Sequence, residues 1–444
     1  IVFGDWSSDV CSSDLVKEEI ESTFKIALQV DDMEIILEDS YALTTAVSDF
    51  KKGIELFQQK SWSPALTLLR KAEAKFQVES QAQLRMEASY LIASILSQQK
   101  KFQTAKIFYE KLNGLAKDLN HSKYLQTSQF MQGFCAYKTG QLTAAITLFD
   151  EIEIDNSQFI NKLQYYSIRG LIFKKLEINS KAIESLANAY EISQKMPQND
   201  VLNRQIAQIL FDWGMVVYRQ GIATLKSSGF QNQEALSEYI AALKSTIQKI
   251  TQAINLWENL RDIPNIIYAY RFIANVHGLL QNSENQVEAY EKALNYAEQT
   301  NDFSQKLKIV GEIYQINAKL GNHQVNIKLM HQVLENMESN AFIDALSQAR
   351  VHLSLGDSYG LIGEKDNAIL EYITALNIFK RLPRPVQEEA ILQNKLIAIY
   401  SAQQNQEKIE YYQSQLAQVQ QKLEENAPKD KLSLGVLKIG RAHV

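Results

Sequence analysis

Proline, glycine and cysteine are all scarce in this 444-residue chain, which contains 6, 17 and 2 of them. Folds built from β-strands need many turn-forming residues, so this shortage excludes a β-sandwich or barrel and favours long helices. Two cysteines are too few for a disulfide scaffold. No apolar run approaches the roughly 18 residues that cross a bilayer. We therefore predict no membrane span.

Charge of one sign is not concentrated anywhere along the chain. The formal net charge is -5, with 46 basic residues scattered among 51 acidic ones. Proteins that bind nucleic acids carry a clustered basic surface, so we expect no nucleic-acid partner for this segment. With 45% hydrophobic and 22% charged residues, the composition is that of a chain with a packed core.

Catalytic and metal-binding motifs are also absent. The sequence has no GxxxxGK[ST], GxGxxG, GxSxG or HExxH. His323 and His331 are eight positions apart, but His323 follows Gly321 and is expected in a loop, and no ligand cluster completes a metal site. Cys135 lacks a paired histidine and is expected to be a small packing residue. We predict that the protein is not an enzyme and binds no cofactor.

The two ends of the chain differ from its middle. Asp9 to Leu15 and Ile439 to Val444 match in-frame translations of a common sequencing adapter, so we interpret residues 1–15 and 438–444 as adapter-derived. The natural gene is then expected to extend beyond both cuts. Cys135 is left as the single thiol, which fits a reducing environment and suggests a cytoplasmic location.

One spacing of small and large residues recurs along the chain. Near the C-terminus, Gly356 is followed by Ala368 twelve positions later, then by Tyr372 and Ala375. The same spacing begins at Gly53, Ala93, Gly133 and Gly170, and it returns in altered form at Gly214, Ala274, Tyr314 and Ile397. Small residues at such spacing let two antiparallel helices approach closely.

This pattern resembles the tetratricopeptide repeat, a hairpin of two helices, A and B. The resemblance implies an all-α fold over residues 40–425, an α-solenoid of about nine such hairpins in a right-handed superhelix. Most repeats are about 40 residues long, whereas the usual period is about 34, so we expect helices one turn longer or longer loops. The longer step from Gly214 to Ala274 predicts a helical insertion at about 219–245.

Segments outside the repeats are short. Residues 16–37 have an apolar stripe at helical spacing and are predicted to form an amphipathic helix, and residues 426–437 are read as a truncated tail. The first hairpin places Val47, Phe50, Ile54 and Phe57 on its inner face. So apolar a face is expected to be covered by the 16–37 helix or by a missing upstream domain.

In the family that this chain resembles, helix A lines a concave groove. We assign the family's groove positions to the matching residues of this chain, one repeat at a time. The resulting residues are aromatic at one end of the repeat array and polar and basic at the other. The residues are Tyr90, Phe130, Phe134, Tyr137, Gln164, Lys174, Gln208, Phe211, Met215, Tyr218, Tyr268, Arg271, Asn275, Lys308, Gln315, Arg350 and Asp357.

Such a surface suits an extended peptide. Asparagine and glutamine amides pair with peptide N–H and C=O groups, arginine holds carboxylates, and aromatic rings take apolar side chains. Arg271 and Asn275, one turn apart, resemble the clamps of peptide-binding relatives. The partner is thus expected to be another protein or peptide; its identity and the oligomeric state do not follow from the sequence.

We predict a non-enzymatic scaffold that binds a peptide or helical segment in this groove. Two alternatives stay open. The first is a peptide-sensing regulator of the kind found in bacterial signalling, whose effector domain is missing. The second is a phosphatase-like regulator, because some long-repeat relatives promote aspartyl-phosphate hydrolysis from an N-terminal bundle.

Overall fold

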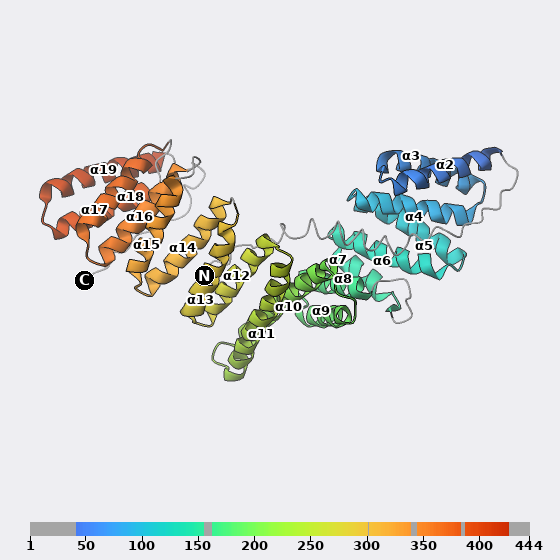
Figure 1. Ribbon diagram of the computed structural model, residues 1–444, viewed down its shortest axis with the longest axis horizontal. Coiled ribbons are helices and arrows are strands. Elements are labelled where there is room, and N and C mark those ends of the chain that lie inside the picture. The colour runs from blue at the N-terminus through green and yellow to red at the C-terminus, as the bar shows by residue number, and fades with distance from the viewer. Residues whose placement is uncertain (1–40, 155–161, 301, 339–343, 383–386, 426–444) are drawn as a thin grey trace. The chain divides into compact units, whose positions relative to one another are not determined.

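A computed structural model describes residues 41–154, 162–300, 302–338, 344–382 and 387–425 of the chain (Figure 1). These residues form helices joined by short turns, and none of them lies in a β-strand. The prediction of an all-α helical-repeat fold is therefore confirmed. The adapter-like ends, the 16–37 segment and the 426–437 tail lie outside the described residues.

Successive helices alternate as A and B members of hairpins. Those that the structure describes are α2 (Tyr41–Gln58), α3 (Trp62–Val78), α4 (Ala82–Gln98), α5 (Phe102–Asp118), α6 (Ser122–Lys138), α7 (Leu142–Asp150), α8 (Lys162–Lys175), α9 (Asn179–Gln194), α10 (Asp200–Ser228), α11 (Gln233–Asn259), α12 (Ile263–Leu279), α13 (Ser283–Glu298), α14 (Phe303–Lys319), α15 (His323–Glu338), α16 (Ala345–Leu361), α17 (Lys365–Phe379), α18 (Gln387–Ala402) and α19 (Gln406–Glu425). His323, expected in a loop, is instead the first residue of α15.

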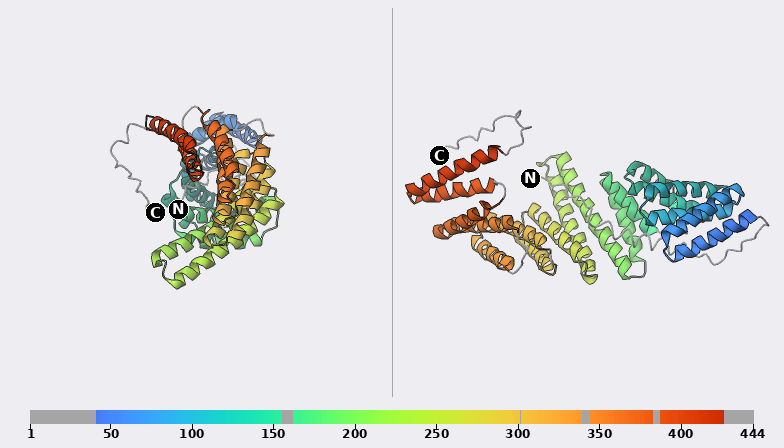
Figure 2. Two further views of the ribbon diagram at one scale, coloured as in Figure 1. Left: turned by 90° about the vertical axis from the view of Figure 1, so that its left-hand side faces the viewer. Right: turned by 90° about the horizontal axis from the view of Figure 1, so that it is seen from above.

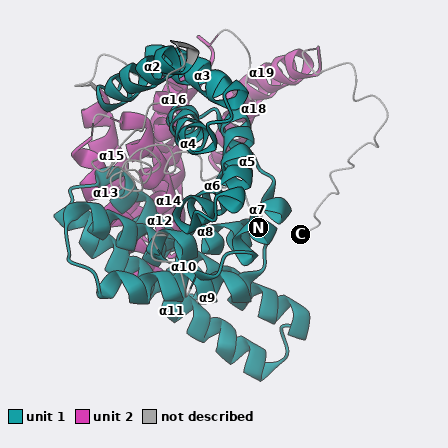
Figure 3. Cartoon of the chain, turned by 90° about the vertical axis from the view of Figure 1, so that its right-hand side faces the viewer, with its two compact units in different colours: residues 1–282 teal, residues 283–444 magenta. Residues whose placement is uncertain are grey.

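The chain divides into two compact units, residues 1–282 and 283–444 (Figure 3). The first holds five complete hairpins, from α2/α3 to α10/α11, followed by α12. The second holds α13 and the hairpins α14/α15, α16/α17 and α18/α19. Within each unit, consecutive helices lie side by side (Figure 2).

Helix length explains the long repeat. Each helix from α3 to α6 has 17 residues, and three residues separate it from the next. Two helices and two turns then fill 40 residues, so of the two explanations offered by the sequence, longer helices are the correct one. The turns contain a residue with positive φ, which is non-glycine at Lys60, Ser80, Lys100 and Asn120. Gly363 has a φ of 86°, as expected for the end of a helix A.

The predicted small anchors pack as the spacing requires. A Cβ atom at Gly53 would lie 2.8 Å from the side chain of Leu69, and at Gly133 it would lie 2.8 Å from the ring of Phe149. Phe149 also contacts Tyr165 of the next hairpin, with 5.5 Å between ring centroids. The large helix B residue therefore both covers its own glycine anchor and reaches the next hairpin.

The hairpin α10/α11 is longer than its neighbours. Its helices have 29 and 27 residues and project past α9 and α12 (Figures 1 and 2). Gly221 permits close contact between them, because a Cβ there would lie 2.7 Å from the Cβ of Ala242. The side chain of Asn232 caps α11 by accepting from the backbone N–H groups of Glu234 and Ala235.

The helices that the structure describes are too short or too polar to pass through a lipid bilayer.

Candidate functional site

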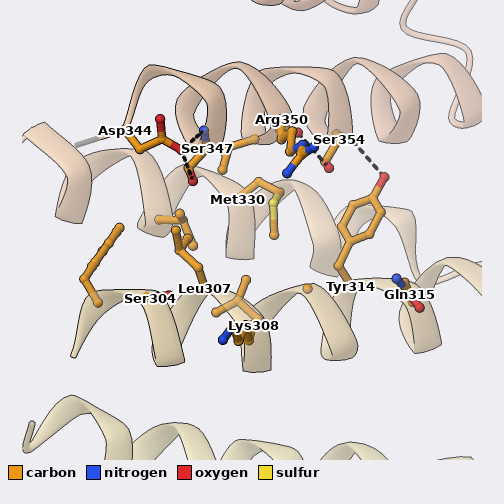
Figure 4. A pocket seen from close by; sticks show the side chains of 15 residues that line it. Ser304, Leu307, Lys308, Tyr314, Gln315, Met330, Asp344, Ser347, Arg350 and Ser354 are labelled. Atoms are coloured by element: carbon orange, nitrogen blue, oxygen red, sulfur yellow. Dashed lines mark hydrogen bonds between the residues drawn. The ribbon is translucent and has the colours of Figure 1, made fainter. Parts of the chain in front are cut away.

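The second unit contains a cavity of about 690 Å³ between two A helices, α14 and α16, with α15 behind it (Figure 4). That volume lies in the range of roughly 300–1,000 Å³ that ligand pockets have. Three of the predicted groove residues line it, namely Lys308 and Gln315 from α14 and Arg350 from α16. The fourth residue predicted in this unit, Asp357, does not line it.

One side of the cavity carries a residue that departs from the usual repeat pattern. Tyr314 stands where most other repeats have glycine or alanine. Its hydroxyl donates to the backbone oxygen of Ser354 at 2.9 Å and accepts from the Ser358 hydroxyl at 3.3 Å. A bulky ring at an anchor position prevents the close helix contact that glycine allows. Tyr314 therefore bridges α14 and α16 at one side of the cavity (Figure 4).

The walls of the cavity are apolar. Leu307 and Val310 come from α14, Met330 and Val333 from α15, and Val351 from α16. Val310, Met330, Val333 and Val351 are each less than 8% exposed, so they belong to the core of the unit and only edge the cavity. An apolar side chain placed here would gain free energy by leaving water.

Gly311 lies in the same lining and was not named by the sequence analysis. A Cβ atom at this position would meet no atom within 4 Å, unlike one at the anchor glycines. Glycine inside a helix lowers stability by about 1 kcal/mol relative to alanine. At position 311 no close contact with another helix compensates for this loss. Tyr90, Phe130 and Phe211 each stand three residues before their anchor, and the same offset from Tyr314 is the signal that could have identified Gly311.

The rim of the cavity is polar. The Asp344 carboxylate caps α16 by accepting from the backbone N–H groups of Leu346 and Ser347, each at 3.2 Å. Arg350 forms an ion pair with Glu388 of α18 at 2.6 Å. Burial alone would raise the pKa of Glu388, but hydrogen bonds from Arg350 and the backbone hold it below its ordinary value.

Lys308 and Gln315 are two rim residues whose side chains have no polar partner in the described part of the chain. Both are exposed, and neither forms a hydrogen bond or an ion pair within the described part of the chain. An uncommitted ammonium can pair with an anion, and an uncommitted amide can both donate and accept. The cavity therefore combines an apolar interior with two polar groups available to a ligand.

Asp357 has a structural role in the same unit. It accepts from the Tyr372 hydroxyl at 2.7 Å and pairs with Lys395 of α18 at 2.9 Å. Burial and the hydrogen bond to this carboxylate raise the pKa of Tyr372. These contacts join α16, α17 and α18.

In the first unit, the predicted residues Lys174 and Gln208 both bind Asp212, which the sequence did not identify. Lys174 of α8 pairs with Asp212 of α10 at 2.5 Å, and the Gln208 amide donates to the other carboxylate oxygen at 2.9 Å. Asp212 is only 4% exposed, and the Lys174 side chain is 15% exposed. Because their polar groups satisfy one another, this cluster stabilises the contact between α8 and α10.

Most predicted groove aromatics of the first unit are withdrawn from solvent. Tyr90, Phe130, Phe134 and Phe211 are 4–6% exposed, and Gln164 is 5% exposed. Phe130 packs edge-on against Phe149, and Phe134 packs in the same way against Phe102. Tyr137 is half-buried, with the ammonium of Lys175 5.1 Å from its ring centroid. Phe130 and Phe134 therefore pack into the core of the first unit, against residues of the B helices α7 and α5.

The remaining residues predicted in the first unit lie on α10 and α12. Phe211 contacts Tyr268 at 5.4 Å between ring centroids, and Tyr218 contacts Phe272, also at 5.4 Å. Met215, Tyr218, Tyr268 and Arg271 are half-buried, while Asn275 is exposed. An aromatic cluster thus joins the two helices, and Asn275 stands at the surface beyond it.

The apolar face predicted for the first hairpin is buried within the described residues. Val47, Phe50 and Phe57 are at most 6% exposed, and Ile54, the fourth residue of that face, is half-buried. Phe50 packs edge-on against Phe76, and Phe57 against Trp62, both of α3. The helix predicted to cover this face lies outside the described residues.

Nucleophile and metal chemistry find little support in the part of the chain that the structure describes. Within it, no group of three histidine, cysteine or acidic residues converges on one point. Cys135 is buried, and burial raises the pKa of its thiol to about 12. A thiol with so high a pKa carries almost no thiolate at neutral pH, which agrees with a packing role.

Comparison with known families agrees with the fold. A family model described as the tetratricopeptide repeat matches residues 87–119, which confirms the resemblance inferred from the spacing. No curated protein sequence matches the chain significantly.

Three solved structures illustrate the likeness. The apo form of RapI is 12% identical, covering 86% of this chain and 99% of that one, with a TM-score of 0.46. Aspartyl phosphate phosphatase F from Bacillus subtilis is 13% identical, covering 88% and 96%, with a TM-score of 0.40. YrrB, described as a tetratricopeptide protein with an unusual peptide-binding site, is 17% identical, covering 53% and 96%, with a TM-score of 0.35. All three scores lie below 0.5, so these likenesses carry no argument about the ligand of this chain.

Proposed function

We propose that the protein is a non-enzymatic binding scaffold and that the cavity between α14 and α16 receives a peptide segment of another protein. The observation that carries this proposal is the pairing of an apolar interior with the uncommitted side chains of Lys308 and Gln315. Polar groups in a protein core form hydrogen bonds within the protein, whereas a binding site has a few polar groups that pair with a ligand.

The shape of the site favours a peptide over a compact ligand. Ser304 and Gln315 both line it and are eleven positions apart on α14, which corresponds to about 16 Å of helix. An extended chain advances about 3.3 Å per residue, so roughly five residues would span this distance. Glutamine beside such a chain can pair with one backbone N–H and one C=O group.

A selection experiment tests the proposal. The full chain is immobilised and used to select from a displayed library of random decapeptides, with an unrelated helical protein as the control target. Hydrogen exchange is then measured with and without the best synthetic peptide. We expect the peptide to slow exchange in α14 and α16 and to leave α2 and α3 unchanged. Failure to enrich peptides, or protection confined to the first unit, would show that the proposal is wrong.

A further inference from the structure

The cavity has one feature that helix packing does not explain, which is glycine at position 311. At the anchor positions, glycine is required because a Cβ atom would lie 2.5–2.9 Å from a helix B side chain, as it would at Gly356, Gly133 and Gly214. At Gly311, a Cβ atom would meet nothing within 4 Å. Its backbone is helical and has no positive φ that would need glycine.

Any larger residue at position 311 would project into the cavity. Gly311 lies on the lining together with Leu307 and Val310 of the same helix. A glycine within a helix destabilises it relative to alanine or leucine. What offsets this loss is open space in a cavity that Gly311 lines together with Met330.

Among the described residues, the unpaired charge in the cavity lining is positive. Lys308 precedes Gly311 by three positions, so its side chain leaves the same face of α14. Of the other charged residues in the lining, Asp344 is occupied in capping α16 and Arg350 is paired with Glu388. Lys308 is therefore the charged group of the lining that has no partner among the described residues.

Building on the proposed function, we propose that the site selects an extended peptide with a bulky apolar residue close to an acidic one. The apolar side chain occupies the space over Gly311, and the acidic side chain pairs with Lys308. The absence of a side chain at Gly311 determines how large the apolar residue can be. The partner is thus a protein segment that carries leucine, methionine or an aromatic residue near aspartate or glutamate.

Two variants of the full chain test this proposal by peptide selection followed by measurement of Kd. Gly311→Leu fills the space, and we expect it to weaken the best wild-type peptide at least tenfold. A version of that peptide with alanine at the apolar position should change less than threefold. Gly114→Leu is the matched control, because Gly114 is also a helical glycine with no atom within 4 Å of a Cβ, but it lies on α5. It should leave both peptides unchanged.

Lys308→Glu tests the charge. We expect it to replace the preference for an acidic residue by a preference for lysine or arginine, whereas Lys328→Glu, on an exposed position of α15 outside the lining, should not. Wild-type peptides that bind Gly311→Leu equally well, or an acidic preference that survives Lys308→Glu, would overturn this inference while leaving the binding function intact. Selection of no peptide at all would instead remove the proposed function and this inference together.

Discussion

Gly356 of α16 lies against the ring of Tyr372 of α17, so closely that a Cβ atom on residue 356 would come within 2.5 Å of two ring carbons. Tyr372 cannot move away easily, because it is 4% exposed and its hydroxyl is bound to Asp357. The tight contact between these two helices therefore depends on the missing side chain.

Gly356→Ala is expected to destabilise the protein. Overpacking of this kind costs about 1–3 kcal/mol, and the measurement is the midpoint of denaturant unfolding. Gly114→Ala is the control. Its Cβ would meet no atom within 4 Å, so the better helix propensity of alanine should raise stability by roughly 0.4–1 kcal/mol. Equal effects of the two substitutions would contradict the packing argument.

Asp212→Ala should also be strongly destabilising. It leaves the largely buried Lys174 ammonium without its carboxylate, and removal of one member of a buried pair costs about 3 kcal/mol or more. The double variant Asp212→Leu with Lys174→Met removes both charges and is expected to recover most of that loss. Thermal melting of the wild-type protein and the two variants measures the difference; a double variant no more stable than the single one would count against a buried pair.

Glu87 gives a prediction about pH. Its carboxylate accepts a hydrogen bond from the Tyr124 hydroxyl, and burial raises its pKa above the ordinary value of 4.5 despite that bond. The folded protein then holds this proton more tightly than the unfolded chain does. The Glu87 contribution to stability is present below pH 4.5 and is lost as the pH rises through the raised pKa.

Glu87→Gln should therefore gain stability relative to the wild type between pH 4 and pH 7, because an amide has no proton to lose. Urea unfolding at both pH values measures this gain. Glu55→Gln, on an exposed position of α2, serves as the control for the loss of one charge. A constant difference between Glu87→Gln and the wild type across this range would show that the carboxyl is not perturbed in the folded state.

Gln315 and Asn275 allow the two units to be compared as peptide sites, because both side chains are exposed. Gln315→Ala is expected to weaken a selected peptide by about 1–2 kcal/mol if the Gln315 amide pairs with the ligand backbone. Asn275→Ala tests the face of α12 in the same way, with an expected loss of about 1–3 kcal/mol if that face also binds. Titration calorimetry measures both, and unchanged affinity with unchanged melting would remove the residue concerned from the site.

Much of the fold could be predicted because its determinants are local. The anchors at Gly53, Gly133 and Gly356 and their large partners recur at constant spacing, and this spacing reflects contacts between helices adjacent in sequence. Helix A of each hairpin could be found in the same way. The split into two units could not, since it depends on how strongly each hairpin contacts the next.

The candidate site was harder to predict than the fold. Spacing identified which residues of helix A face inward, including Lys308, Gln315 and Arg350, but not whether the space between two A helices is filled. Tyr90, Phe130 and Phe211 stand three residues before their anchors, as Gly311 does before Tyr314, and they are buried by their neighbours. Asp212 was missed because nothing in its own repeat marks it as the partner of Lys174, 38 positions earlier.

The sequence by itself determined that this protein is a series of paired helices with small residues at their crossing points, because a periodic pattern of side-chain size specifies contacts between neighbouring helices. Only the tertiary structure decided where an open space remains. That outcome depends on the combined volume of side chains from three helices, α14, α15 and α16, which no single repeat encodes. Tyr314 of α14 bonds to Ser354 of α16 in the lining of this space, and Gly311 adds no side chain to it.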